Sequence, residues 1–295
     1  MSLLQKKIVA VYRSADYSPN LADADTLILQ SVANKLQCEG AIVALMAEDE
    51  FLSSSINCSL ILSMSRSEAA LKKMQMLSDN GILVINSAQS IKNCTRLNIH
   101  KISEGKGIYL PKYTLLETSA TENIEQKNLT YPLWLKLPEA PAVSKDDICF
   151  VTAEEELIEV LNNFANRGIK NILAEEHLQG DLVKFYSVAG TKFIHTSYPT
   201  LSGYSKFGCE EHNDPIKNIP FSIDLLYEMS QKLALMTGLR IFGGDCIISP
   251  QGEPYLIDFN DWPSFSVCRE EASLAIVEMI KNDLNKHERE TTPTE

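Results

Sequence analysis

Positive charge is scarce in this 295-residue sequence, in which 27 lysines and arginines stand against 39 acidic residues and the formal net charge at pH 7 is −12. Such a chain repels nucleic acid and anionic membranes, so any phosphate-binding surface must be a local basic pocket. No apolar run reaches the ~18 residues of a membrane-spanning helix, and the apolar run Ile8–Val11 is only long enough for a strand. We therefore expect a cytoplasmic protein with a small-molecule or peptide substrate and no nucleic-acid or membrane partner.

Cysteine and histidine offer few sources of chemistry. The seven cysteines are isolated, without a C-x-x-C pair, which is typical of buried thiols in a reducing compartment. The sequence contains no G-x-x-x-x-G-K-[ST], G-x-S-x-G or H-E-x-x-H motif and no zinc-ligand spacing. Of the five scattered histidines, we expect His177 to contribute backbone groups and His195 to pack on a strand. Without a nucleophile-and-base pair, the chemistry must come from positioning and electrostatics.

The composition is that of a globular protein. Hydrophobic residues make up 44% and charged residues 22% of the sequence, and the length suits two or three structural units. Residues 6 to about 92 alternate strand and helix patterns, which predicts a small parallel sheet with covering helices. No G-x-G-x-x-G follows the first strand, so this part is not interpreted as a dinucleotide site.

The remaining segments predict further elements. A short helix is expected over Ala88–Leu97, and Gly107–Tyr113 is expected to link it to the next unit. Thr152–Glu155 has the pattern of a capping box, which predicts a helix that ends near Gly168. Further helices are expected over 222–237 and from 268 to about 284.

The segment Phe242–Phe265 predicts a metal-binding β-hairpin. Two apolar runs flank the turn Pro250–Glu253, in which proline presets φ and glycine permits the tight corner. Pairing about this turn places Asp245 opposite Asp258, and the two-residue period of a strand puts Asn260 on the same face as Asp258. Two carboxylates and an amide oxygen suit Mg²⁺, with Mn²⁺ as an alternative ion. The other interpretation, an ordinary exposed hairpin flanked by acids, stays open.

This hairpin resembles the last strands of the ATP-grasp superfamily, whose members hold ATP and Mg²⁺ between two α+β subdomains and usually join a carboxylate to an amine. The resemblance implies a mixed α/β and α+β fold with antiparallel sheets and the nucleotide in the cleft between them. It implies a Rossmann-like pre-ATP-grasp domain over 1–92 and a small ATP-grasp subdomain with its linker over 93–172. The C-terminal subdomain with the hairpin would cover 173–285, and 286–295 would be a frayed tail.

Two strand lysines extend the resemblance. Lys136 is the only charge within Tyr131–Pro138, and Lys184 is the only lysine within Gly180–Gly190. A charge among apolar strand residues must find an anion or reach water. The resemblance assigns both lysines, and Arg96 after the last N-terminal strand, to the nucleotide phosphates. An ordinary solvated helix charge is the alternative for Arg96.

Two further segments complete the nucleotide site that the resemblance implies. Residues 139–146 would be the loop that folds over the phosphates; it lacks the glycines that relatives often have, and Ser144 and Lys145 are its candidate donors. The strand that ends near residue 176 would be the hinge that pairs with adenine, with an acid for the ribose hydroxyls. The choice of ribose acid stays open among Glu175, Glu176 and Asp181. The candidate hinge residues are Glu175, Glu176, His177 and Leu178.

The resemblance implies an ATP- and Mg²⁺-dependent ligase for a carboxylate and an amine. The carboxylate would attack the γ-phosphate to give an acyl phosphate, and the amine would then displace phosphate. Arg240 is the candidate catalytic cation, and the polar stretch Tyr198–Pro220 is the candidate substrate-recognition loop. Two alternatives stay open: an ATP-grasp kinase that phosphorylates a small polyol such as an inositol phosphate, and a non-catalytic nucleotide-binding module. A homodimer is equally open.

Overall fold

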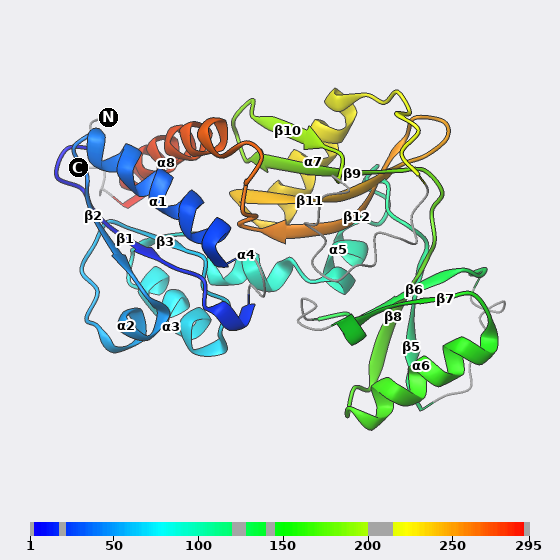
Figure 1. The fold of residues 1–295 in the computed structure, drawn as a ribbon. Coiled ribbons are helices and arrows are strands. Elements are labelled where there is room, and N and C mark those ends of the chain that lie inside the picture. The colour runs from blue at the N-terminus through cyan, green and yellow to red at the C-terminus, as the bar shows by residue number, and fades with distance from the viewer. Residues whose placement is uncertain (1–2, 18–21, 120–127, 140–144, 200–214, 292–295) are drawn as a thin grey trace.

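The computed structural model describes residues 3–17, 22–119, 128–139, 145–199 and 215–291. Within them lie three four-stranded sheets, which follow one another along the chain (Figure 1). The first is parallel, with the strand order β2-β1-β3-β4. The other two are antiparallel, with the orders β5-β8-β6-β7 and β10-β9-β11-β12. The predicted α/β and α+β architecture is thus confirmed.

Helices cover both faces of the parallel sheet, and β1 is accordingly apolar and buried over four successive residues. One face packs against α1 and the C-terminal helix α8, which lie side by side, and the other packs against α2 and α3. The elements are β1 (Lys7–Val11), η1 (Ala15–Tyr17), α1 (Ala22–Cys38), β2 (Ile42–Met46), α2 (Glu48–Ser53), β3 (Leu60–Ser63), α3 (Glu68–Asp79) and β4 (Leu83–Ile85).

The second sheet and α6 form a smaller lobe with its own apolar core (Figure 1). It is reached through α4 and α5, which the sequence predicted as a single helix. The chain breaks there because the Thr95 side chain accepts a hydrogen bond from Asn98 N and caps a new helix. The elements are α4 (Ala88–Asn93), α5 (Arg96–Ser103), β5 (Tyr113–Glu117), β6 (Leu133–Lys136), η3 (Lys145–Asp147), β7 (Ile148–Val151), α6 (Glu154–Asn166) and β8 (Asn171–Glu176).

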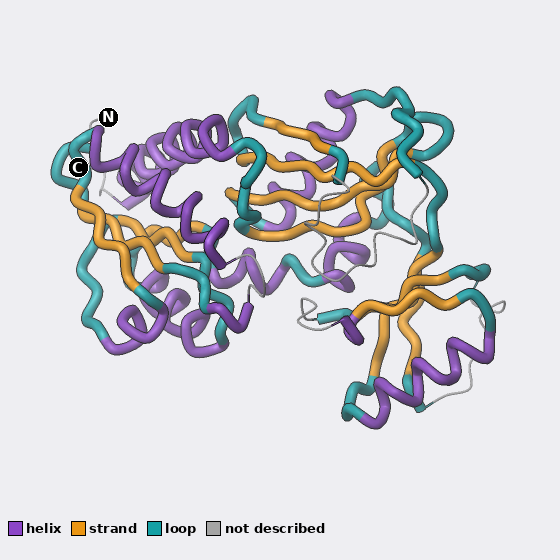
Figure 2. The backbone as a smooth tube through the Cα atoms, viewed as in Figure 1, coloured by secondary structure: helices purple, strands orange, loops and turns teal. Residues whose placement is uncertain are grey.

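The third sheet carries the predicted hairpin and packs against α5 and α7. Its four strands run side by side in Figure 2. The helix α7 ends at Gly238, whose φ of 81° is the left-handed conformation that favours glycine at a helix end. The elements are β9 (Asp181–Val188), β10 (Ile194–Ser197), α7 (Ile223–Thr237), β11 (Ile241–Ile248) and β12 (Pro254–Asp261).

The C-terminal helix α8 (Arg269–Thr291) is longer than the sequence predicted. Residues 286–291 are helical rather than frayed, and 292–295 lie outside the described residues. The apolar side chains of α8 belong to the same core as those of α1 and of the end of the hairpin at Trp262. This shared core joins the first sheet to the third. Among the described helices, none is long and apolar enough to cross a membrane.

Gly244 of β11 allows the neighbouring strands β9 and β12 to approach it closely. A Cβ atom at this position would lie 2.1 Å from the carbonyl oxygen of Asp258 and 2.9 Å from the ring of Phe185. We expect Gly244→Ala to lower the free energy of unfolding by about 1–3 kcal/mol or more, because the strands cannot separate without losing hydrogen bonds. Chemical denaturation measures this loss; Ala44→Gly, on an exposed position of β2, is the control for a change of one methyl group.

Candidate active site between the antiparallel sheets

The hairpin brings the predicted metal ligands together. Asp245 and Asp258 are direct partners across β11 and β12, and Asn260 stands opposite Gly243. The Asn260 amide Nδ2 donates to Asp258 Oδ2 at 3.1 Å, so these two side chains share a face of the strand as predicted. The register shifts after Asp245, which marks a β-bulge beside the acids. The carboxylates therefore face each other at an irregular point of the sheet.

Cations surround both carboxylates. Lys184, which pairs in register with Asp245, donates from Nζ to Asp245 Oδ1 at 3.3 Å. Arg96, at the start of α5, places Nε 3.9 Å from Asp258 Oδ1. Burial would raise the pKa of Asp258, but the charges of Arg96 and Lys136 outweigh it and lower that pKa. Asp258 is thus held as a carboxylate.

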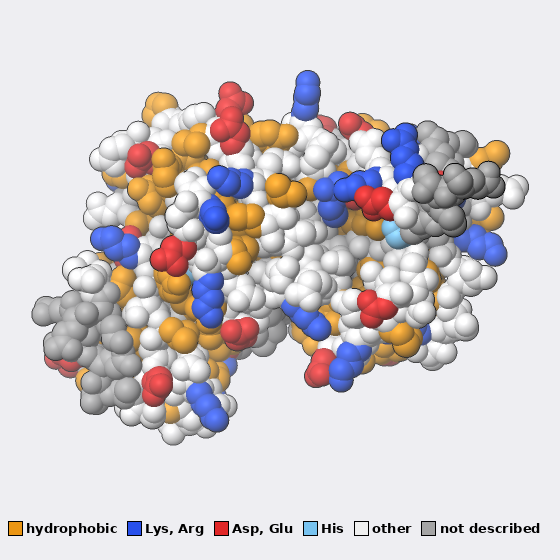
Figure 3. Space-filling view, turned by 180° about the vertical axis from the view of Figure 1, so that it is seen from behind, with side chains coloured by type: hydrophobic (Ala, Val, Ile, Leu, Met, Phe, Trp, Pro, Cys, Tyr) orange, Lys and Arg blue, Asp and Glu red, His pale blue; other side chains and the backbone are white. Residues whose placement is uncertain are grey.

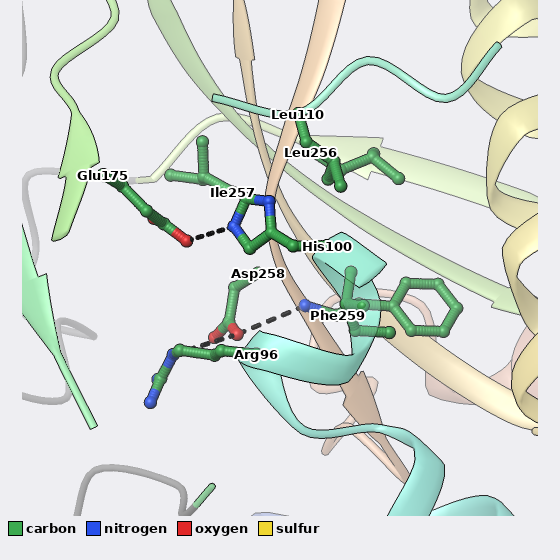
Figure 4. A pocket seen from close by; sticks show the side chains of 9 residues that line it. Arg96, His100, Leu110, Glu175, Leu256, Ile257, Asp258 and Phe259 are labelled. Carbon is green, nitrogen blue, oxygen red and sulfur yellow. Dashed lines mark hydrogen bonds and ion pairs between the residues drawn. The ribbon is translucent and has the colours of Figure 1, made fainter. Parts of the chain in front are cut away.

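A second charged cluster lies on the facing lobe. The Nζ atom of Lys136 donates to Glu175 Oε2 at 2.6 Å and to the carbonyl oxygen of Ile257 at 3.2 Å. His100 Nε2 lies 2.7 Å from Glu175 Oε1, and Figure 4 shows the two side chains pointing toward one another. Burial would raise the pKa of Glu175, yet Lys136 and His100 lower it to about 2. Glu175 is therefore ionised and fully engaged.

Arg96, Lys136, Glu175, Asp245 and Asp258 line one cavity between the second and third sheets, with about 690 Å³ of empty space including its open mouth. Lys184, Asn260 and His100 contact these wall residues. In the space-filling view a notch separates the lobe that carries α6 from the N-terminal part (Figure 3). Eight of the residues predicted from the sequence lie in the wall of the cavity. They are Arg96, Lys136, Glu175, Glu176, His177, Leu178, Asp245 and Asp258.

The hinge end of the cavity is aromatic. Trp134 lies against Phe150 with ring centroids 4.8 Å apart, and its indole Nε1 donates to His177 Nδ1 at 3.2 Å. Leu178 and Leu182 continue the apolar wall. Glu176, which is half-buried, also lines the cavity and accepts a hydrogen bond from Lys112 N at 3.0 Å. A flat apolar slot therefore adjoins the charged end.

Some predicted residues lie elsewhere. Both carboxylate oxygens of buried Asp181 accept backbone N–H groups, those of Lys217 and Ile219 at 2.7 Å, so Asp181 holds a chain segment rather than facing the cavity. Arg240 forms a bidentate ion pair with Asp283 of α8, at 2.6 and 2.7 Å, which ties that helix to the third sheet. This geometry does not support the catalytic role predicted for Arg240.

The predicted phosphate loop and the predicted recognition loop lie partly outside the described residues. Ser144 lies outside them, and Lys145 begins η3. Of the candidate recognition loop Tyr198–Pro220, residues 200–214 also lie outside.

Sequence reasoning missed His100 and Trp134. His100 stands four residues after Arg96 on α5, which places both on one helix face, and Trp134 stands two residues before Lys136 on β6, which places both on one strand face. Helical and strand periods anchored on Arg96 and Lys136 would have pointed to both residues.

The oxygen donors fit a hard divalent cation. Two facing carboxylates and a neighbouring amide oxygen match the few protein ligands that Mg²⁺ takes when it keeps water and phosphate oxygens for its other positions. Within the described residues no group of three or more histidine, cysteine or acidic side chains has the geometry of a metal site.

Sequence comparison finds no relatives: no family model matches the chain, and no curated protein is significantly similar to it. Solved structures do match. A D-alanine–D-alanine ligase from Bacillus anthracis has a TM-score of 0.71 at 14% identity, and the match covers 97% of this chain and 99% of that one. Such ligases are ATP-grasp proteins. The chain has the ATP-grasp fold.

Two further neighbours show how fully the ATP-grasp fold accounts for the chain. The Bacillus anthracis ligase complexed with ATP matches with a TM-score of 0.68 at 13% identity, over 96% of this chain and 99% of that one. VanG D-Ala:D-Ser ligase from Enterococcus faecalis matches with a TM-score of 0.66 at 15% identity, over 94% and 99%. Near-complete coverage in both directions means that no sheet of the described structure lies outside the shared fold.

Proposed function

We propose that this protein is an ATP- and Mg²⁺-dependent ligase that joins a carboxylate to an amine through an acyl phosphate. The observation that carries the proposal is the cavity between the two antiparallel sheets. Its wall brings Lys136 and Arg96 together with the facing acids Asp245 and Asp258. The fold supports the same conclusion, because its neighbours are carboxylate–amine ligases and one of them was solved with ATP.

The apolar slot suits the base of the nucleotide. Trp134, Leu178 and Leu182 offer apolar surface for adenine. The backbone N–H groups of Glu176 and His177 donate to the carbonyl oxygens of Lys112 and Pro132, so these two groups are engaged within the protein. Glu176 is the best candidate for the ribose hydroxyls. Of the three acids considered, it lines the cavity with a partly exposed carboxylate, whereas Glu175 is bound by Lys136 and His100.

The charged end suits the phosphates. Lys136 and Arg96 supply positive charge from two directions, and Lys184 lies beside Asp245. Asp245, Asp258 and Asn260 would hold Mg²⁺, which would neutralise charge on the phosphate oxygens. A substrate carboxylate oxygen then attacks the γ-phosphorus, the bond to the ADP oxygen breaks, and Lys136 and Arg96 stabilise the negative charge that develops. Attack of an amine on the acyl carbon releases phosphate and leaves the amide.

Trp134 should report nucleotide binding. Adding ATP with Mg²⁺ is expected to quench its fluorescence, because adenine would stack in the slot that the indole lines. A titration that follows tryptophan emission measures this. The chain has two tryptophans, and Trp262 is fully buried away from the cavity wall. The variant Trp262→Phe should keep the signal and Trp134→Phe should lose it; an unchanged signal in Trp134→Phe would contradict the assignment.

Trapping the intermediate tests the reaction. Hydroxylamine attacks an acyl phosphate at its carbonyl carbon, so an active ligase given ATP, Mg²⁺ and its acid should form a hydroxamate and release phosphate in step with ADP. A screen of carboxylic acids measures both products. ADP release with the phosphate retained on a polyol would instead support the kinase, and no response to any acid or polyol despite ATP binding would support a non-catalytic module.

A further inference from the structure

A second cavity, of about 930 Å³, lies on the other side of Asp258 and Arg96. These two residues line both cavities, so their ion pair stands between the proposed nucleotide site and this second space. Asn260 also lines the second cavity. A ligand there would therefore lie next to the carboxylates that we assign to the metal and the phosphates.

The second cavity lies at the edge of the parallel sheet where ligands of such sheets bind. In the order β2-β1-β3-β4, the strand that follows β1 in the chain lies on one side of it, and β3 lies on the other side. The connections after β1 and after β3 therefore run in opposite directions, and the order of the strands reverses between β1 and β3. Open α/β sheets bind ligands at such a switch point, at the carboxyl ends of the strands. Tyr17 follows β1, Arg66 follows β3, and both line the cavity. Topology and cavity geometry thus point to one place independently.

Arg66 places a guanidinium in the wall of this cavity, and not all of its N–H groups are hydrogen-bonded within the part of the chain that the structure describes. Its Nη2 atom donates to the carbonyl oxygen of Asp261 at 3.1 Å and also binds the Asp261 carboxylate. Its side chain is 13% exposed, and within the described residues its buried Nε atom has no hydrogen-bond partner. A guanidinium presents five N–H donors in a planar fork, and the hydrogen bonds of Arg66 to Asp261 use only Nη2, so its Nη groups keep donors for an anion in the cavity. The helix α3 begins at Glu68 directly after its cap Ser67, which adds the positive end of a helix dipole.

The remaining wall fits a short organic acid. Leu71 and Ile91 supply apolar surface, and exposed Lys92 supplies a second cation. Arg96 is paired with Asp258 and Arg66 with Asp261, and Glu139 adds a third acid to the wall.

We propose that this second cavity binds the carboxylic acid substrate and that this acid carries a second anionic group. The reacting carboxylate lies at the Arg96 and Asp258 end, and the second anion lies at Arg66 and Lys92. The proposal rests on the proposed ligase function and adds the substrate class. A zwitterionic amino acid without a further charge would leave the Arg66 donors unused.

The test compares acids with and without a second anionic group. With ATP, Mg²⁺ and hydroxylamine, glutarate and succinate are compared with butyrate, acetate and both enantiomers of alanine. We expect kcat/KM for glutarate to exceed that for butyrate at least tenfold. Equal values for the two, or a preference for alanine, would overturn the proposal. The melting temperature of the ATP-bound protein gives a second readout. If neither diacid is turned over and neither raises the melting temperature, the proposal is also overturned.

Matched variants test whether Lys92 and Arg66 bind the second anionic group of the acid. Lys92→Met should raise KM for glutarate about tenfold and leave KM for butyrate and ATP unchanged, whereas Lys101→Met, an exposed lysine of α5 outside the cavity wall, should change none of them. Arg66→Lys keeps the charge but loses the fork, and should raise KM for glutarate more than for butyrate. Because Lys92 is exposed, its variant decides the question even if Arg66→Lys does not fold. If ATP quenches Trp134 fluorescence but no diacid is bound or turned over, the proposed substrate class is wrong and the nucleotide site stands. If ATP does not quench Trp134 fluorescence, the proposed function itself is wrong.

Discussion

Replacing Asp258 by asparagine is expected to lower kcat for ATP turnover by roughly 10²–10³-fold, because a carboxylate that we propose to hold the metal at the phosphates becomes neutral. Binding of ATP should lose its dependence on Mg²⁺. Binding without metal should not weaken, since a negative charge beside the phosphates has been removed and Arg96 and Lys136 remain. Isothermal titration with and without Mg²⁺ measures both.

The matched control is Glu253→Gln, which removes a carboxylate from the turn of the same hairpin at an exposed position. It should change neither ATP binding nor turnover. If Asp258→Asn kept full Mg²⁺-dependent turnover, the metal assignment would be wrong. If it lost ATP binding equally with and without Mg²⁺, Asp258 would have a structural role instead.

The hairpin over β11 and β12 could be predicted because its information is local. A turn sequence between two apolar runs fixes the register, and the register fixes which acids face each other. The observed pairing of Asp245 with Asp258 confirms that step. The two strand lysines stood out because each is a charge that interrupts an apolar strand, whereas the hinge was assigned by its position in the ATP-grasp resemblance.

The pairing of these charges could not be predicted, because it depends on strand order. Lys136 and Glu175 each stand out in the sequence, yet their ion pair requires β6 to lie beside β8. Tyr113 was expected in a linker, whereas it begins β5, the other neighbour of β8. Because the strand β5 was not predicted, the neighbours of β8 in the second sheet could not be assigned.

Asp181 and Arg240 were predicted as site residues, but the structure gives both of them structural contacts. Each was a reasonable candidate for chemistry by its position in the sequence, but each is committed to a segment more than 35 residues away. Asp181 binds the backbone at Lys217, and Arg240 binds Asp283 of α8. Long-range structural contacts of this kind leave no local pattern, so a sequence cannot separate them from ligand contacts.

Replacing Glu175 by glutamine should destabilise the protein by about 3–5 kcal/mol, because it leaves the Lys136 ammonium buried without its counter-ion. The side chains of Glu175 and Lys136 are 3% and 9% exposed, so solvent cannot replace the lost partner. Denaturation in urea measures the loss. The neighbouring Glu176→Gln, a half-buried acid beside exposed Lys112, should change stability by no more than about 1 kcal/mol.

Two further measurements separate a lost charge from lost packing. The double variant Lys136→Met with Glu175→Gln should be more stable than Glu175→Gln alone, since the unpaired charge is gone; equal or greater loss would mean that packing dominates. Added ATP should stabilise Glu175→Gln more than the native protein, because the phosphates would give Lys136 a new anionic partner.

The acid dependence of stability follows from the same pair. The folded-state pKa of Glu175, about 2, lies below the ~4.3 of an unfolded chain, so its contribution is complete above pH ~4.3 and is lost as the pH falls toward 2. The pKa difference corresponds to about 3 kcal/mol. The native protein should therefore lose stability across that window more steeply than Glu175→Gln, and unfolding free energies at a series of pH values would show it. Parallel curves for the two proteins would mean that Lys136 and His100 do not hold Glu175 as an ionised carboxylate.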